Sequence, residues 1–334
     1  METRKVQLTG GSTYTVSLPK QWAAEHDIEA GRRLRLYPRT DGSLLLRTDH
    51  AETGEETTTR VSVDGLDAEA LGRTVQALYI VGLDEFALTA RSLTTAQRRA
   101  VAAAAAGLIG LETVEESERR IVLRSLLSSS EVSVRQSTVQ LQFVALSMYR
   151  EAMTALADAD AELAGHVIER DDEADRLFGL VNRHFQRALD SMSEIERLGI
   201  DRPTAFDYYA TARQLERVAD HAERIATVAT RLDAPPEAGP IGDIRAAARR
   251  SRGVVEDAAS VLLGGGSAEQ AYDALAARKE LTAELEAIDR ALYAGDASEA
   301  YLLGLVVDSV ERATDYGANV AETAVQASVR VDDG

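Results

Sequence analysis

The sequence predicts a mainly α-helical protein in which two tandem three-helix bundles follow a small β head and a small α+β domain. From about residue 133 to residue 328, apolar residues recur at steps of three and four, the spacing that places them on one helix face. Within this region two acid-bearing segments repeat one another 95 residues apart. Residues 4–18 instead alternate apolar and polar around Gly10-Gly11, which is typical of two strands joined by a tight turn.

The first fifty residues predict four short strands and one helical turn. After the hairpin at 4–18, Pro19 favours the start of a helix over residues 21–26. Residues 33–38 and 43–47 alternate again on either side of Asp41-Gly42, a hairpin turn signal. Because so few residues make a thin core, we expect this module to need a second copy of itself.

These residues resemble the AbrB/SpoVT swapped-hairpin family. The resemblance lies in the run from Gly10 to Lys20, the short helix, Gly31, the alternating basic strand and Asp41-Gly42-Ser43-Leu44-Leu45. That family forms intertwined β dimers that bind DNA, so the resemblance implies a dimeric DNA-binding domain over residues 1–50. The candidate DNA-binding residues are Arg4, Lys5, Lys20, Arg32, Arg33 and Arg35. The alternative is a head that only dimerises, because an excess of two cations over residues 1–50 is small for a DNA-binding surface.

The charge distribution separates this head from the rest of the chain. The net charge is −18, and only three of the 37 cations are lysine, a balance that resembles proteins adapted to high salt. The chain has no cysteine, which excludes disulfides and thiolate metal sites. No apolar run approaches the length of a membrane span and no signal peptide is evident, so we expect a cytoplasmic protein without membrane insertion.

Residues 51–58 are polar and predict a linker. The following residues, 58–130, predict a small α+β domain in βαβαββ order. Its expected strands are 60–63, 85–89, 111–115 and 120–126, and its expected helices are 67–80 and 94–106. The segment holds no Gly-rich phosphate loop, nucleophile elbow or histidine cluster, so its ligand and role stay open.

Six long helices are expected in the remainder, divided as 131–234 and 241–330. Their predicted bounds are 133–157, 160–190, 203–232, 241–263, 267–293 and 297–328. Residues 155–175 align with 262–282, and the third helix of each set aligns at an offset of 95. The first set therefore carries about twelve additional residues near 191–206. Two tandem three-helix bundles are the simplest architecture.

Acid pairs recur in the repeated helices. Glu216 and Asp220 are four residues apart and share one face, as do Asp171 and Asp175 on the preceding helix. If the two pairs converge, four carboxylates suit a hard or borderline cation such as Mg, Mn, Ca, Fe or Zn. The alternative is a solvated face: 55 acids give about nine such pairs by chance. Arg213, Arg217 and Arg224 could then pair with the acids.

Over residues 130–330 the chain also resembles the PhoU family. The motifs are Asp171-Asp172-Glu173-Ala174-Asp175, Leu215-Glu216-Arg217-Val218-Ala219-Asp220-His221 and Val310-Glu311-Arg312-Ala313-Thr314-Asp315-Tyr316. PhoU proteins are two tandem three-helix bundles with Glu/Asp-x-x-x-Asp metal motifs; they restrain phosphate uptake with the phosphate transporter and its signalling partners, and are not enzymes. The resemblance implies metal ligands at Asp171, Asp175, Glu216, Asp220, Glu311 and Asp315, with a divalent or trivalent ion such as Fe, Zn, Mn or Mg.

The second bundle departs from this pattern. Arg278 stands where the alignment places Asp171, and Thr282 stands where it places Asp175. We therefore expect the second bundle to bind metal poorly or not at all, with Arg278 neutralising Glu311 or Asp315.

These features predict a cytoplasmic, dimeric, non-enzymatic regulator of phosphate uptake that also binds DNA. Its expected partners are DNA and a phosphate ABC transporter or its signalling proteins. One alternative is a carboxylate-bridged metalloenzyme of helical-bundle type, although no Glu-x-x-His ligand pair occurs in the sequence. The other alternative is an adaptor without metal.

Overall fold

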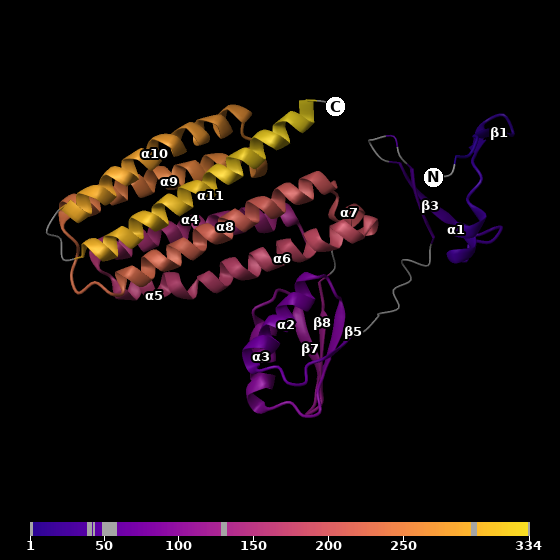
Figure 1. Cartoon of the computed structure of the whole chain (residues 1–334), viewed down its shortest axis with the longest axis horizontal. Coiled ribbons are helices and arrows are strands. Elements are labelled where there is room, and N and C mark those ends of the chain that lie inside the picture. The colour runs from indigo at the N-terminus through magenta and orange to yellow at the C-terminus, as the bar shows by residue number, and fades with distance from the viewer. Residues whose placement is uncertain are drawn as a thin grey trace. The chain divides into compact units, whose positions relative to one another are not determined.

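The computed structural model describes residues 3–38, 42, 44–48, 59–127, 132–294 and 299–332. The predicted linker at 51–58 and the turn residue Asp41 lie outside these residues. The chain divides into two compact units, Met1–Thr57 and Thr58–Gly334 (Figure 1). No helix in the described part of the chain combines the length and the apolar content that a membrane span needs.

The head contains the predicted strands and helical turn. Its elements are β1 (Gln7–Thr9), β2 (Thr13–Thr15), α1 (Lys20–Glu25), β3 (Leu34–Pro38) and β4 (Leu44–Thr48). β1 pairs antiparallel with β2 and β3 with β4, as two separate two-stranded sheets. Gly10 and Gly11 adopt φ of 67° and 80°, the left-handed region that glycine allows in the first turn.

No described side chain of the head is buried. Six large apolar side chains are instead between 47% and 77% exposed: Val6, Leu8, Tyr14, Val16, Leu36 and Leu44. A single copy of the head therefore lacks a hydrophobic core of its own, as its short strands predicted.

The α+β domain has the predicted βαβαββ order. Its elements are β5 (Thr59–Ser62), α2 (Ala68–Ile80), β6 (Glu85–Thr89), α3 (Thr95–Ala106), β7 (Leu111–Glu116) and β8 (Arg120–Ser125). The strand order is β5-β6-β8-β7, with β5 parallel to β6 and the other neighbours antiparallel. Asp67 caps α2, and Thr94 with Gln97 forms a capping box on α3. Helix and strand residues such as Val75 and Phe86 are fully buried in its core.

The rest of the chain is helical. It contains α4 (Val134–Asp158), α5 (Ala161–Glu169), α6 (Asp171–Asp190), α7 (Met192–Leu198), α8 (Arg202–Ala229), α9 (Ala238–Leu263), α10 (Ala268–Ala294) and α11 (Ala300–Asp332). α4, α5 with α6, and α8 pack together, and so do α9, α10 and α11. The two bundles share one continuous core, because α4 also packs on α9 and α8 on α11 (Figure 1).

Two details differ from the sequence prediction. The helix expected over 160–190 is divided at Arg170, which ends α5 and precedes α6. Arg170 donates hydrogen bonds to Glu151 and Ser147 of α4, at 2.7 Å each, so its side chain links this break to the neighbouring helix. The additional residues near 191–206 contain the short helix α7, which Ser191 caps.

Helix α6 also anchors the α+β domain. The guanidinium of Arg183, 2% exposed, donates to the carbonyls of Tyr79 and Leu83 at 2.6 and 3.0 Å, and to Asp84 at 2.9 Å. Arg187 donates to the carbonyl of Gly82 at 3.1 Å. These bonds add side-chain donors to carbonyls at and just after the end of α2, where the Tyr79 carbonyl also accepts from the backbone nitrogen of Gly82 at 3.0 Å.

Candidate functional site

Three carboxylates of the first bundle meet between α6 and α8. One carboxylate oxygen each from Asp171, Asp175 and Asp220 lie within 4.8 Å of one another. Asp171 opens α6, and Asp175 follows one turn later on the same face. Glu216 lies one turn before Asp220 on α8. The packing of α6 on α8 therefore brings Asp171 and Asp175 against Asp220. Glu216 is not one of the three acids that meet, although the charges of Asp175 and Asp220 raise its pKa.

Burial and mutual repulsion make the ionised form of this cluster unfavourable. Burial raises the pKa of Asp171 to about 7, with further repulsion from Asp175, Glu223 and Asp220. Burial also raises the pKa of Glu216 to about 7, with repulsion from Asp220 and Asp175. The pKa values of Asp175 and Asp220 are raised as well, chiefly by burial.

The arginines that the solvated-face alternative names act on this cluster without forming close ion pairs in the described part of the chain. Arg213 and Arg217 lower the pKa of Glu216, and Arg224 and Arg217 lower that of Asp220, so they offset part of the repulsion. Among the described residues, no ion pair joins Asp171, Asp175, Glu216 or Asp220 to an arginine. The guanidinium of Arg217 instead lies 5.5 Å from the ring centroid of Tyr316. One carboxylate oxygen of Asp171, Oδ1, is buried without a hydrogen-bond partner. A bound cation would satisfy this oxygen and offset the repulsion, so the residues present fit a hard metal ion.

Sequence reasoning missed Glu223 as a member of this cluster. Its charge raises the pKa of both Asp171 and Asp175, so it lies close to the start of α6. The available signal was its position three residues after Asp220, which places it on the same side of α8. Asp172 raises the pKa of the same two residues, so both Glu223 and Asp172 add negative charge beside the three acids that meet.

The corresponding site of the second bundle is neutralised. Asp315 accepts hydrogen bonds from Arg278 Nε at 3.0 Å and Nη2 at 2.7 Å. Thr282 donates its hydroxyl hydrogen to the carbonyl of Arg278 at 3.2 Å. Asp315 is thus one of the two acids that the sequence offered as a partner for Arg278. Burial and the charge of Asp315 raise the pKa of Glu311, and the charge of Glu286 on α10 adds to this repulsion.

His221, next to Asp220, is a packed residue. It is 4% exposed and its ring lies 5.6 Å from the ring of Tyr316 on α11. Burial and the nearby Arg224 lower its pKa to about 4, so the ring is neutral at pH 7.

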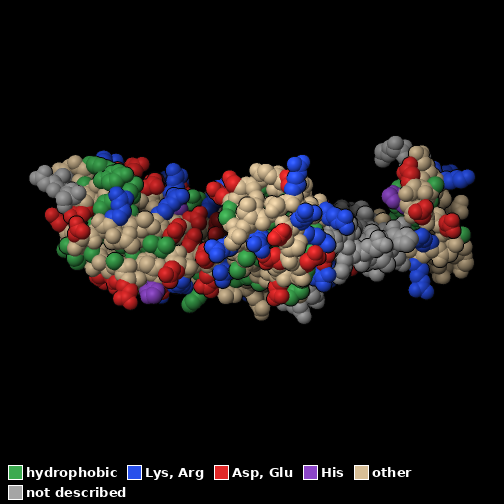
Figure 2. All heavy atoms as spheres, turned by 90° about the horizontal axis from the view of Figure 1, so that it is seen from below, with side chains coloured by type: hydrophobic (Ala, Val, Ile, Leu, Met, Phe, Trp, Pro, Cys, Tyr) green, Lys and Arg blue, Asp and Glu red, His purple; other side chains and the backbone are tan. Residues whose placement is uncertain are grey.

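The basic residues of the head lie largely on its surface. Arg4, Lys5, Lys20 and Arg33 are exposed, and Arg32 is half-buried with a hydrogen bond of 3.2 Å to the carbonyl of Asp27. The side chain of Arg35, on β3, lies outside the described residues. The face shown in Figure 2 carries both acidic and basic side chains on the head and on the helical unit.

The comparisons with known proteins agree with both resemblances. Residues 138–229 match a family model described as the PhoU domain, and residues 7–52 match one described as antidote-toxin recognition MazE, bacterial antitoxin. Curated proteins yield no match.

The helical part is similar to a solved structure of PhoU from Pseudomonas aeruginosa, with 22% sequence identity and a TM-score of 0.53. The similarity covers 59% of this chain and 96% of that one. The phosphate transport system regulatory protein PhoU from Streptococcus pneumoniae aligns with 19% identity and a TM-score of 0.49, over 59% of this chain and 94% of its own. The chain therefore carries a PhoU domain within a helical part of the PhoU fold, preceded by an N-terminal domain of the MazE/AbrB-like type.

Proposed function

We propose that this protein is a non-enzymatic, cytoplasmic regulator of phosphate uptake that binds DNA as a dimer through its N-terminal head. The observation that carries the proposal is the joining of a PhoU-type helical part to a MazE/AbrB-like head. The helical part binds a phosphate ABC transporter or one of the transporter's signalling proteins. On this account the helical part responds to the state of uptake and the head acts at promoters.

The exposed apolar residues of the head support a dimer. Leu8 and Tyr14 face each other across the first hairpin and are 61% and 77% exposed, and Leu36 of the second hairpin is 58% exposed. Apolar surface of this extent gathered on fifty residues is stabilised when a second copy covers it. A dimer also doubles the basic residues available to one DNA duplex.

The proposed DNA contacts are Arg4, Lys5, Lys20, Arg32, Arg33 and Arg35. Such contacts release counterions from DNA, so the affinity must fall steeply as salt rises. A protein with a net charge of −18 is repelled by DNA everywhere except at a locally basic surface. Binding should therefore depend on the head and weaken by about tenfold or more when two of these cations are removed together.

A gel-shift titration of the full chain on promoters of phosphate-transport genes tests the DNA proposal. Lys5→Gln/Lys20→Gln should lose most of the affinity, whereas Arg73→Gln, which removes an exposed cation paired with Glu69 on α2, should not. If the wild-type dimer binds none of these promoters at low and at molar salt, the head faces a protein instead. That partner would then be sought among toxin proteins, because the matching family model is described as antidote-toxin recognition.

For the helical part, we propose that Asp171, Asp175, Glu216 and Asp220 hold one divalent or trivalent metal ion, such as Fe, Zn, Mn or Mg. Glu223 stands beside them as a further oxygen donor. The ion would supply positive charge that keeps the carboxylates ionised and ties α6 to α8. This role is structural, and none of these residues is assigned a step in a reaction.

A further inference from the structure

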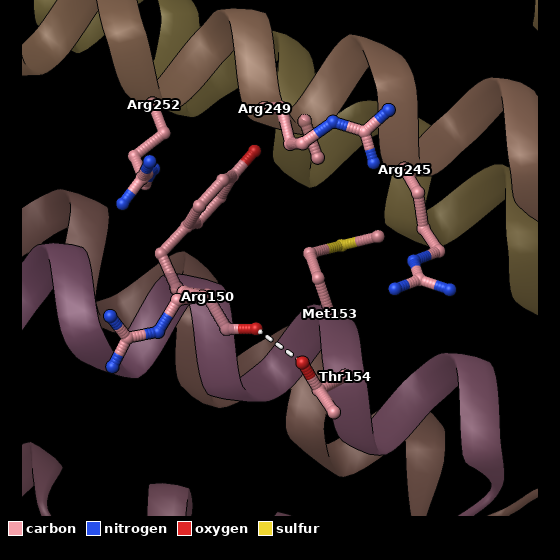
Figure 3. A pocket seen from close by; sticks show the side chains of 8 residues that line it. Arg150, Met153, Thr154, Arg245, Arg249 and Arg252 are labelled. Atoms are coloured by element: carbon pink, nitrogen blue, oxygen red, sulfur yellow. Dashed lines mark hydrogen bonds between the residues drawn. The ribbon is translucent and has the colours of Figure 1, made fainter.

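A cavity opens where the two bundles meet, between α4 and α9. It has a volume of about 170 Å³. Figure 3 shows Arg245, Arg249 and Arg252 on one side of the space and Arg150, Met153 and Thr154 on the other. Tyr149 and Ala248 complete its lining.

The lining is strongly basic in a chain that is strongly acidic. Four of its eight residues are arginines and none is acidic, although the chain has 55 Asp and Glu against 37 Lys and Arg. Arg245, Arg249 and Arg252 follow one another at helical spacing on α9, so their charges repel along one face. Among the described residues, none of these three has a carboxylate within ion-pair distance.

Another arginine of α9 does form ion pairs with acids of the neighbouring helix. Arg250, on another side of α9, donates to Glu280 and Glu284 of α10. Arg150 of α4 pairs with Glu151 at 3.2 Å, and that carboxylate also accepts from Arg170 at 2.7 Å, so Arg150 shares its partner. The cavity therefore holds a concentration of positive charge that the protein itself does not neutralise.

A buried tyrosine also lines the cavity. Tyr149 is 1% exposed, and its hydroxyl has no hydrogen-bond partner of normal geometry although Ser251 lies beside it. Burial raises the pKa of this hydroxyl far above its usual value, so it remains a neutral donor.

We propose that this cavity binds a phosphate-bearing anion. The planar guanidinium fork matches the oxygen geometry of phosphate and donates two parallel hydrogen bonds to it. Three arginines without an acidic partner favour a doubly charged anion over a single carboxylate. The source is either inorganic phosphate or a phosphomonoester, since an adjoining hollow shares Arg150 and Arg252 and adds Phe143, 72% exposed, as a surface for an organic group. The same hollow contains the carboxylate of Glu256, so the phosphate group itself belongs in the arginine cavity. The inference stands apart from the metal and DNA proposals and goes beyond both.

Isothermal titration of the full chain, freed of metal with a chelator and held at fixed ionic strength, tests this proposal. The probes are inorganic phosphate, a nucleoside monophosphate, and vesicles that contain a phosphate-bearing anionic lipid. Wild type should bind at least one of them, and Arg249→Gln/Arg252→Gln should weaken that binding at least tenfold. Arg250→Gln is the matched control on the same helix and should leave binding unchanged. Asp175→Asn/Asp220→Asn should also leave it unchanged, which separates the cavity from the acidic cluster.

The remaining variants identify the source and guard against misfolding. Phe143→Ala should weaken binding of the nucleoside monophosphate alone if the adjoining hollow holds its organic group. If the double glutamine variant does not fold, Arg249→Lys/Arg252→Lys keeps the charge but removes the guanidinium fork, and it should still bind at least severalfold more weakly. Absence of binding by all three probes, or equal affinity in wild type and the arginine variants, would overturn the proposal.

Discussion

Arg278 directs both Nε and Nη2 to Oδ1 of Asp315, at 3.0 and 2.7 Å. In the first bundle, the helix position equivalent to Arg278 is Asp171, which has no arginine partner among the described residues and instead faces two further carboxylates. Two differences, Arg278 in place of Asp171 and Thr282 in place of Asp175, thus replace a repulsive cluster with an ion pair. The two halves of the repeat share a fold but differ in the charge that they present at the corresponding place.

Restoring the acids should restore a site. Arg278→Asp/Thr282→Asp gives α10 the two carboxylates that α6 has and frees Asp315 from its partner. We expect the number of metal ions bound per chain, measured by elemental analysis after dialysis, to rise from one to two. Arg290→Asp, on an exposed part of α10, is the matched control and should leave the number at one. If the folded double variant still binds a single ion, charge alone does not explain why the second bundle binds no metal.

The metal-free protein should be less stable at pH 8 than at pH 5 because of Asp171 and Glu216. Both folded-state pKa values are raised to about 7. A carboxyl with a raised folded pKa stabilises the fold below its unfolded pKa, and this contribution is lost as the pH rises through about 7. Denaturant unfolding in chelator should show this decline, and Asp171→Asn/Glu216→Gln should flatten it. An identical pH profile in wild type and variant would show that the two groups do not titrate as described.

Arg183 should be a strong determinant of stability. Arg183→Ala removes a buried guanidinium from the carbonyls of Tyr79 and Leu83. Loss of these charged hydrogen bonds and of the bond to Asp84 should cost on the order of 2–4 kcal/mol in the free energy of unfolding. Arg73→Ala, in an exposed pair with Glu69, should cost less than about 1 kcal/mol. Comparable losses in the two variants, measured by denaturant unfolding, would contradict the anchoring role of Arg183.

Gly317 permits the close approach of α11 to α9. A Cβ there would lie 2.9 Å from Val255 Cγ2 and 3.0 Å from the backbone nitrogen of the same residue. Gly317→Ala should therefore destabilise the protein by about 1–3 kcal/mol through overpacking. Gly253→Ala, where a Cβ meets nothing within 4 Å, should instead stabilise it by up to about 1 kcal/mol. Thermal unfolding of both variants and of wild type tests whether Gly317→Ala lowers the stability and Gly253→Ala raises it.

The sequence predicted features that depend on local pattern. Alternation and capping residues such as Asp67 and Thr94 were sufficient for the α+β domain. The acid pairs on α6 and α8 were visible from their spacing, although metal binding there stays a prediction. By contrast, the buried pair of His184 with Glu194, 2.8 Å apart, depends on how the unexpected helix α7 folds back on α6. The arginine cavity likewise forms because α4 packs on α9, so no local sequence pattern predicted it.

The central claim is that metal binding is confined to the first bundle. Isothermal titration with one metal ion, applied to wild type, Glu216→Ala and Glu311→Ala, tests it most directly. The account predicts one site per chain, an affinity at least tenfold lower in Glu216→Ala, and an unchanged affinity in Glu311→Ala. Equal losses in the two variants, or two equivalent sites in the wild type, would contradict it.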